Sequence, residues 1–292
     1  MAKQFSNAQL ARYLYMFDAG EYVRHSAIED RTDNTYLAVT LNQHGEEEDY
    51  VLAILDTVSF DEISFFHNLI SHLSYYGLPV PAPRRTLDGM TSTIFAGRPS
   101  LLMPKEEGSV VKTPTVENCR AIGTLLGELH DATASYEHSR ANPLTAAALS
   151  AAVAEANFDA ALGALVQGAI DSAAALPTDL PTGVIHGDLS LNDVQFHEGE
   201  ISAVQGFFRA CSERLMQDVA AAENVWCTNV DGSLDESRQA AMLETYAEER
   251  EPAAAELDAL PALSALAAAR NVIVCSQTGT DASAFERILT NR

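Results

Sequence analysis

Residues 184–207 read VIHGDLSLNDVQFHEGEISAVQGF, which is the sharpest local signal in the chain. The β-branched run that ends at His186 predicts a strand, and the polar loop 187–193 follows it directly. The runs at 194–196 and 201–207 predict two further strands, because a glycine-containing turn separates them. The predicted order is therefore strand, loop and strand pair, with polar side chains gathered where the first strand ends.

The chain before this stretch predicts a lobe of mixed helices and strands. Apolar residues at helical spacing indicate two helices, the first with Asn7 as its N-cap. Runs of β-forming residues indicate strands, and the acidic sequence HGEEED at 44–49 is typical of a solvated turn between the first two. The helices are expected at 7–18 and 61–76, and the strands at 35–40, 50–55 and, as a short pair around Gly97, within 93–103. This order favours an α+β lobe with a mostly antiparallel sheet.

Helices dominate the chain from residue 104 onward. A helix is predicted at 118–134, alanine-rich helices with recurring leucines within 144–175, and further helices from Asp218 to the end. We therefore expect two domains, an α+β lobe over 1–103 and a mainly helical lobe over 104–292 that carries the polar loop.

Composition and charge narrow the class of protein. The chain has 292 residues, 47% of them hydrophobic, which predicts a folded globular protein. Its 41 acidic and 18 basic residues give a net charge of −23, so neither nucleic acid nor an anionic membrane surface is an expected partner. The acid surplus with few lysines fits a salt-loving host or a GC-rich genome, and an ordinary acidic cytosolic protein equally well.

The sequence also predicts a cytoplasmic location. The N-terminus is polar and unlike a secretion signal, and no stretch is expected to reach the ~18 uncharged apolar residues that a membrane helix needs. The four cysteines form no CxxC pair and are expected to be free thiols.

The polar loop carries the candidate chemistry. His186-Gly187-Asp188 resembles the start of the H-x-D-x-x-x-x-N loop of kinase-like phosphotransferases. In those enzymes the Asp accepts the proton of a substrate hydroxyl, while the Asn and a later Asp hold magnesium on the ATP phosphates. A chance HxD in a strand–loop is the plain alternative, but here a strand pair follows it and an α+β lobe precedes it. The resemblance implies a two-lobed protein-kinase-like, or aminoglycoside phosphotransferase-like, α+β fold.

A more specific resemblance covers nearly the whole chain. The run at 210–235, with its Trp-Cys and Asn-x-Asp-Gly-Ser-Leu-Asp elements, is similar to the type II homoserine kinases, as are YVLAIL, GLPVPAP and GRPSLL earlier in the chain. The resemblance implies phosphorylation of homoserine or a similar small hydroxylated amino acid, with ATP and Mg2+ as cofactors. It assigns catalysis to Asp188 and His186, nucleotide binding to Asn34 and Thr35, metal binding to Asp193, and the substrate side to Arg270 and Asp218. Two other roles remain open for Asp218, a brace of the loop or a plain acid at a helix N-terminus. Arg270 could equally be a surface arginine. His130 is expected to be structural, and Trp226 is expected in the core.

The departures from that family fall at catalytic positions. The loop Asn of the family falls on Asp193, with Asn192 one step early, and its metal Asp falls on Gly206. A glycine of its nucleotide loop falls on Arg31, where a bulky side chain should hinder close approach to phosphates. Asp193 remains a possible magnesium ligand, whereas Gly206 offers none. Glu213 or Glu223 could supply a replacement carboxylate.

These features favour a degenerate family member, a pseudokinase with little or no activity. It could be kept as a small-molecule binder, for an amino acid or a nucleotide, or as a partner of another protein. One rival is a working homoserine kinase with rearranged metal ligands. The other is a non-catalytic interaction module with a kinase-like fold.

Overall fold

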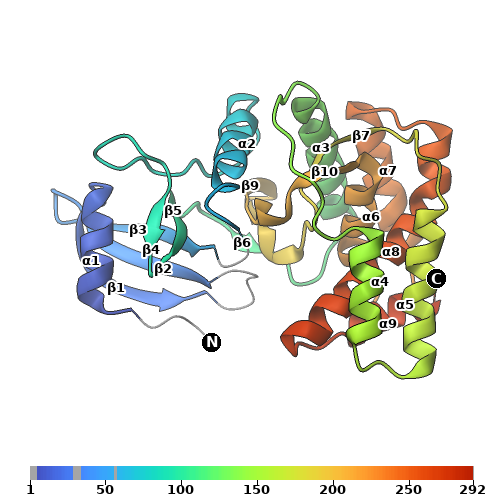
Figure 1. Ribbon diagram of the computed structural model, residues 1–292. Helices are drawn as coiled ribbons and strands as arrows, with labels where there is room; N and C mark the ends of the chain where they lie inside the picture. Colours follow the sequence, from blue (N-terminus) through green and yellow to red (C-terminus); the bar gives the residue numbers. More distant parts are fainter. Residues whose placement is uncertain (1–4, 29–33, 56–57, 292) are drawn as a thin grey trace. The chain divides into compact units, whose positions relative to one another are not determined.

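The computed structural model describes residues 5–28, 34–55 and 58–291 (Figure 1). The chain divides into two compact units, Met1–Val110 with Asn192–Phe208, and Val111–Leu191 with Arg209–Arg292. They are called the first and the second unit below.

The first unit is built on a five-stranded antiparallel sheet with the strand order β1-β2-β3-β5-β4. Its strands are β1 (Glu21–Ala27), β2 (Asn34–Leu41), β3 (Glu47–Ile54), β4 (Thr93–Phe95) and β5 (Arg98–Pro104), and its helices are α1 (Asn7–Met16) and α2 (Ile63–Tyr75). The helices and the strand pairs therefore lie where the sequence predicted them, and β1 is an addition.

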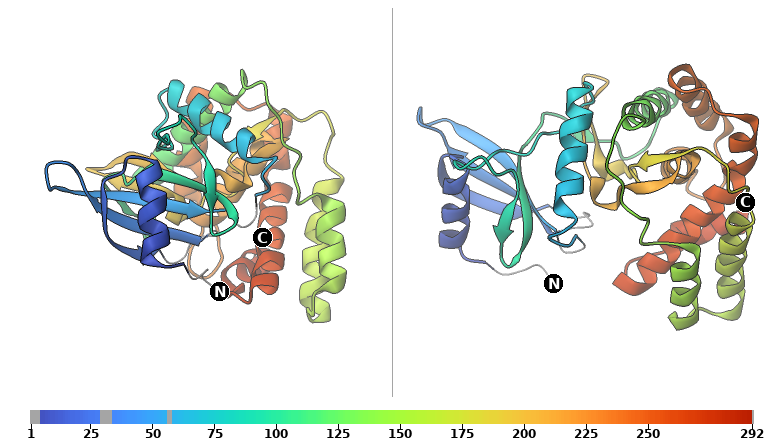
Figure 2. Two further views of the ribbon diagram at one scale, coloured as in Figure 1. Left: turned by 60° about the vertical axis from the view of Figure 1, so that its left-hand side comes forward. Right: turned by 45° about the horizontal axis from the view of Figure 1, so that its top comes forward.

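One face of this sheet is covered by α1 (Figures 1 and 2). The alternating residues Tyr50, Leu52 and Ile54 of β3 join one buried cluster with Leu10 and Leu14 of α1. Alternation places every second side chain of a strand on the same face, so a single helix can bury that row.

Two local predictions in this unit differ from the structure. The N-cap of α1 is Ser6 rather than Asn7, because the Ser6 and Gln9 side chains form a reciprocal capping box. The acidic segment 46–49 is mostly strand rather than turn, since β3 begins at Glu47 and pairs it with Leu41.

A second sheet of the first unit explains why the unit is discontinuous in sequence. Strands β6 (Ser109–Val110), β8 (Val194–His197) and β9 (Glu200–Val204) form it in the order β6-β8-β9. In addition, the Val204 amide donates to the Pro79 carbonyl at 2.7 Å. The expected boundary at 103/104 therefore differs from the observed division, because the β8–β9 hairpin pairs with the end of the first segment.

The second unit is mainly helical, as the sequence predicted. It contains α3 (Val116–Thr133), α4 (Ala146–Glu155), α5 (Ala160–Ala174), α6 (Leu215–Trp226), α7 (Glu236–Glu249), α8 (Ala254–Thr278) and α9 (Ser283–Asn291), with β7 (Thr182–Ile185) antiparallel to β10 (Cys211–Arg214). Helices α3 and α7 approach closely at Gly123, where an added Cβ would collide with the Met242 carbonyl and the Thr245 hydroxyl.

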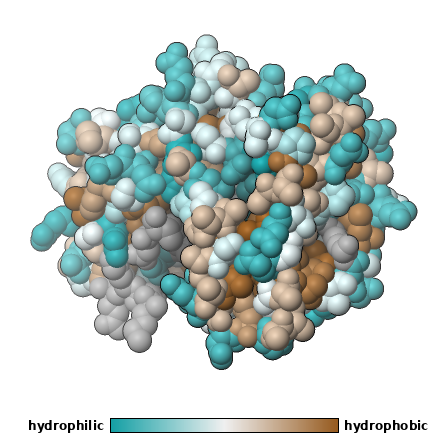
Figure 3. All heavy atoms as spheres, turned by 45° about the vertical axis from the view of Figure 1, so that its right-hand side comes forward, coloured by the Kyte–Doolittle hydropathy of each residue, from teal (hydrophilic) through white to brown (hydrophobic). Residues whose placement is uncertain are grey.

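Helix α8 bears on the expectation about membrane-length stretches. Among the described residues it is the one helix long and apolar enough to cross a membrane, and 56% of its most apolar 18-residue window is buried. The expectation concerned uncharged stretches, and this helix carries Glu256, Asp258 and Arg270, so it does not contradict that expectation. Core helices pass the same test, and this one packs through Ala269, Val272 and Ile273 against α4 and α5. On the face seen in Figure 3, hydrophobic patches are interrupted by hydrophilic residues.

Candidate active site

The second unit holds the HxD loop immediately after β7. His186 is fully buried, and Gly187 has φ +87°. Below the loop, the Asp218 carboxylate accepts from the His186 amide at 2.7 Å and from the Gly187 amide at 2.8 Å. Burial raises the pKa of Asp218, but hydrogen bonding and charge from His130, together with His186, outweigh it and hold the pKa below its ordinary value. Of the roles left open for Asp218, these contacts fit the brace of the loop, because its fully buried carboxylate accepts from the loop backbone.

A buried chain of side chains continues from Asp218. His130 Nε2 lies 3.4 Å from Asp218 Oδ2, and His130 Nδ1 lies 2.9 Å from the Tyr246 hydroxyl. Arg250 donates to that hydroxyl at 2.9 Å and forms a bidentate pair with the buried Glu256 at 2.9 and 3.0 Å. Since the Asp218 carboxylate can only accept, the hydrogen of a neutral His130 lies on Nε2, and Nδ1 then accepts from the Tyr246 hydroxyl, whose oxygen accepts from Arg250. Burial raises the pKa of Tyr246 to about 12, so its hydroxyl keeps its hydrogen.

Two arginines contact Asp188. Nη2 of Arg270 donates to Oδ1 at 2.8 Å, and Nη1 of Arg209 lies 2.9 Å from Oδ2. Nη1 of Arg270 also donates to the Gly187 carbonyl at 2.5 Å, which fixes Arg270 to the loop. Both carboxylate oxygens of the candidate base therefore face a guanidinium group.

Sequence reasoning did not identify Arg209. A signal was present, because this arginine interrupts the apolar run at 207–211. A charged side chain in such a run is costly to bury unless it is paired. The search for a partner would have led to the acids of the HxD loop.

The first unit holds the other candidate residues, Asp193 and Gly206. Asp193 ends a short 3-10 turn, η1 (Leu191–Asp193), and its carbonyl accepts from the Gln205 amide at 2.8 Å. Gly206 has φ +83°, and a Cβ placed there would meet the Asp193 carboxylate, 2.6 Å from its Cγ. The carboxylate of Asp193 thus occupies the space of a side chain at position 206.

The nucleotide-loop residues are only partly described. Asn34 and Thr35 begin β2 and pair with Ile54 and Ala53 of β3. The amide of Ile28 donates to the Thr35 carbonyl at 2.8 Å. Arg31 lies outside the described residues, so its expected obstruction of the phosphates remains a prediction.

Magnesium is the metal that the sequence led us to expect, and Asp193 is the residue assigned to hold it. Within the described residues no group of three His, Cys, Asp or Glu side chains could hold a metal. Asp193 supplies a carboxylate near position 206, and one carboxylate suffices where phosphates and water complete the coordination of Mg2+. The replacement acids considered from the sequence belong to the second unit and are already engaged, Glu213 by Asn142 at 2.9 Å and the buried Glu223 by Gln239 at 2.5 Å.

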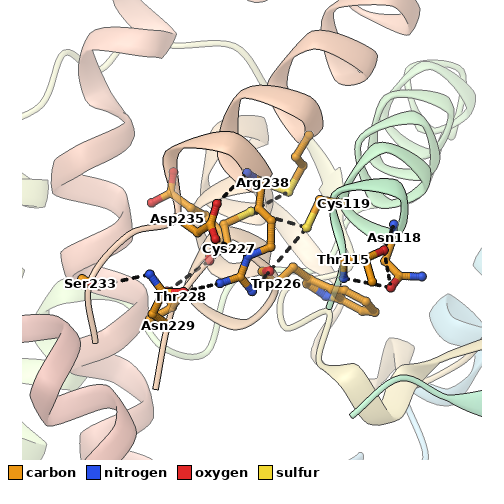
Figure 4. Close-up of polar contacts among 12 residues, drawn as sticks. Thr115, Asn118, Cys119, Trp226, Cys227, Thr228, Asn229, Ser233, Asp235 and Arg238 are labelled. Atoms are coloured by element: carbon orange, nitrogen blue, oxygen red, sulfur yellow. Dashed lines mark hydrogen bonds and ion pairs between the residues drawn. The ribbon is translucent and has the colours of Figure 1, made fainter. Parts of the chain in front are cut away.

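A buried cluster beside the loop comes from the Trp-Cys segment (Figure 4). The Trp226 carbonyl, at the end of α6, accepts from Arg238 at 3.0 Å and from the Cys119 thiol at 3.3 Å. Sγ of Cys119 and Sγ of Cys227 lie 4.0 Å apart, and hydrogen bonding between them, followed by burial, raises the pKa of Cys227. Trp226 is fully buried, as expected, and its indole N–H donates to the Leu189 carbonyl at 3.1 Å. The cluster therefore fixes the residue that follows Asp188.

Comparisons with known proteins show the family to which the chain is related. The family model described as "Phosphotransferase enzyme family" matches residues 25–262. Homoserine kinase of Bradyrhizobium sp. (strain BTAi1) is 32% identical over 269 residues, 90% of this chain and 81% of that protein. Homoserine kinase of Brucella anthropi is 33% identical over 269 residues, with the same coverage.

Solved structures share the fold. An amicoumacin kinase in complex with AMP-PNP and Ca2+ matches 98% of this chain and 93% of its own, with a TM-score of 0.74 at 17% identity. A microcompartment-associated aminopropanol kinase matches 97% and 92%, with a TM-score of 0.75 at 16% identity. The aminoglycoside phosphotransferase-like kinase fold predicted from the sequence is confirmed.

Proposed function

Because the chain belongs to the phosphotransferase enzyme family and has homoserine kinases among its relatives, we propose that it is a homoserine kinase-like protein in which phosphoryl transfer is slow or lost. The family reaction is ATP-dependent phosphorylation of homoserine or a similar small hydroxylated amino acid. The observation that carries the proposal is the Asp193 carboxylate at the place of a side chain on Gly206, which leaves one acidic ligand where two separate ligands are needed.

The HxD loop supports the same proposal. Asp188 would accept the proton of a substrate hydroxyl, and Asp218 holds the loop in place for that task. The two carboxylate oxygens of Asp188 already face Arg209 and Arg270, so a substrate hydroxyl must share one of these oxygens or displace an arginine. Removing one electrostatic contact to a transition state typically lowers the rate by about 10²–10³. A lost magnesium ligand would lower the rate in this way, in addition to the competition of the arginines for Asp188.

A second function is favoured by the same Asp193 geometry. A carboxylate is still present near position 206, supplied from the loop instead of from the residue after Gln205. In this alternative the protein is an active homoserine kinase in which Asp193 is the relocated magnesium ligand. A third reading is an interaction module with a protein partner. In all three we place the protein in the cytoplasm, without a nucleic-acid or membrane partner.

Coupled ADP release and nucleotide binding, each with and without magnesium, separate these functions. We expect negligible turnover with homoserine and related hydroxy amino acids. Asp188→Ala tests the base, and Asp131→Ala, an exposed acid of α3, is the matched control. Robust magnesium-dependent turnover that only Asp188→Ala abolishes would leave the relocated-ligand kinase standing. A protein that binds neither nucleotide nor amino acid would be the interaction module.

A further inference from the structure

We propose that Arg209 and Arg270 form an oxyanion site, in which Asp188 is the resident counterion of the ligand-free protein and is replaced by a carboxylate or phosphate group of a ligand. The proposal deepens the proposed function, on which it rests for the placement of Asp188 at the substrate side. It adds the chemical class of the group that is bound, and it explains how Asp188 becomes free to accept a hydrogen bond from a substrate hydroxyl.

The charges of the cluster do not balance. Two guanidinium groups, Arg209 and Arg270, face the single carboxylate of Asp188. Within the described part of the chain no other carboxylate forms an ion pair with either arginine. The buried Asp218 is engaged by the loop amides and His130 instead. The cluster therefore has one positive charge in excess, in a protein whose net charge is −23.

The hydrogen-bond donors of the cluster are also in excess. Arg270 is 6% exposed, and its buried Nε has no acceptor. Nη1 of Arg209 is close to Asp188 Oδ2, but it is buried and makes no hydrogen bond to that oxygen. Buried guanidinium donors are normally satisfied, so these two indicate oxygen ligands that the ligand-free chain does not supply.

Exposure defines the direction from which a ligand arrives. The side chains of Asp188 and Arg209 are 21% and 22% exposed, whereas that of Arg270 is 7% exposed. A ligand therefore reaches Arg209 first and displaces Asp188 from it. Guanidinium groups match carboxylates and phosphates in a bidentate geometry, so this exchange needs no metal ion.

The exchange links binding to the base. In the ligand-free protein both oxygens of Asp188 face an arginine; once an oxyanion takes Arg209, Oδ2 is free to accept from a hydroxyl. An amino acid with a hydroxyl side chain brings both groups, because its carboxylate occupies the arginine and its hydroxyl meets the released oxygen. A phosphate ligand would occupy the same arginine without supplying the hydroxyl.

Calorimetric titration in EDTA, without nucleotide, tests the site. The probes are acetate, homoserine and inorganic phosphate, each against sodium chloride of equal ionic strength. Binding of acetate and homoserine would show that the arginines take a carboxylate, and binding of inorganic phosphate would show that they take a phosphoryl group. The single tryptophan, whose indole is bonded to Leu189, provides a fluorescence signal from the same loop.

The variants are expected to shift affinity in opposite directions. Arg209→Met should weaken binding at least about tenfold, since one charge-assisted pair is lost. Asp188→Asn should strengthen it several-fold, because the internal competitor loses its charge. Arg120→Met removes an exposed arginine that pairs with Glu244 and should leave binding unchanged.

Three results would each overturn the proposal. They are the absence of saturable binding of all three probes, a loss of affinity in Asp188→Asn, and an equal loss in Arg120→Met. If circular dichroism shows that Arg209→Met does not fold, Arg209→Lys replaces it as the test of the arginine. The sign of the change in affinity in Asp188→Asn then decides whether Asp188 competes with the ligand. The titration contains neither ATP nor magnesium. A failure of the oxyanion site in this titration can therefore be told apart from a failure of the proposed function, which would appear as turnover in the kinase assay.

Discussion

At Gly206 the backbone has φ +83°, and the Asp193 carboxylate fills the space that a side chain would need. Gly206→Asp should therefore lower the free energy of unfolding by about 2–4 kcal/mol, through backbone strain and overpacking together. Adding Asp193→Ala empties that space and should recover part of the loss. Urea unfolding of the four members of this double-mutant cycle measures the coupling, expected at about 1–3 kcal/mol.

Gly199→Asp provides the matched control. Gly199 lies in the β8–β9 turn with φ +92°, and nothing lies within 4 Å of an added Cβ. It reports the cost of the backbone conformation alone. Equal losses at 199 and 206, with no coupling to Asp193, would show that the carboxylate does not occupy the place described.

Acid should weaken the protein through Asp218. Its pKa is held below the ordinary value of 3.8, so its contribution to stability is fully present above pH 3.8 and is lost as the pH falls through the lowered pKa of the folded state. Asp218→Asn should be less stable at neutral pH and lack this component of acid sensitivity. Urea unfolding between about pH 2.5 and 6 measures it, and exposed Asp131→Asn should keep the wild-type slope.

Sequence reasoning found the residues of the loop but not their neighbours. Asp188 and His186 follow from the HxD pattern, and Asp218 from its position in a family run. Arg209 was missed, because its one local signal is that it interrupts an apolar run, and its ion pair joins it to Asp188, 21 positions away. The departures at Asp193 and Gly206 were read separately, with Asp193 kept as a possible magnesium ligand. The space that they share becomes visible only when η1 and the end of β9 are brought together.

At the scale of elements, one hydroxyl ties α3 and α7 to the loop. Tyr246→Phe removes the donor to His130 Nδ1 and the acceptor for Arg250, so buried groups are left unpaired. We expect a loss of about 1–3 kcal/mol in the free energy of unfolding and a change in the chemical shift of His130 Nδ1, which loses its hydrogen-bond donor while Asp218 keeps the hydrogen on Nε2. Nitrogen chemical shifts of the imidazole measure the loss of this hydrogen bond.

A tyrosine-to-phenylalanine change at an exposed site is the control for Tyr246→Phe. Tyr75→Phe, at a tyrosine with 86% exposure in α2, should alter neither stability nor the His130 spectrum. An unchanged Nδ1 shift in Tyr246→Phe would mean that the Tyr246 hydroxyl does not donate to His130.

The elements that were missed or misplaced share a physical reason. Strand β1 is mostly exposed, so no apolar alternation marks it, and β10 has only four residues, of which three are polar. The N-cap moved to Ser6 because a reciprocal pair with Gln9 satisfies more amides than Asn7 could. Long periodic helices such as α3 were predicted within two residues.

At the scale of the whole molecule, the charge of −23 predicts stabilisation by salt. Screening shortens the range of self-repulsion to about 3 Å at 1 M, so the melting temperature should rise between dilute buffer and about 1 M potassium chloride. Sodium sulfate at equal ionic strength separates screening from surface exclusion. Equal gains indicate screening, a gain confined to sulfate indicates exclusion, and no gain contradicts the prediction.

The division into units could not be read from the sequence. Pairing of β8 with β6 joins residues more than 80 positions apart, and local patterns carry no information about such pairs. The helical character of the second unit was predictable, since amphipathic and alanine-rich periodicity is local.

The discontinuity of the first unit has a consequence for synthesis. When Val110 leaves the ribosome, β6 exists but its partner β8 has not been made, and Phe208 follows 98 residues later. At about 5–20 residues per second, this interval lasts roughly 5–20 seconds. During that time β6 and the Pro79 carbonyl await strands that are still being translated. The nascent first unit is thus completed only after much of the helical unit has emerged, and it is in this window that a chaperone or a neighbouring polysome would meet its unpaired edge.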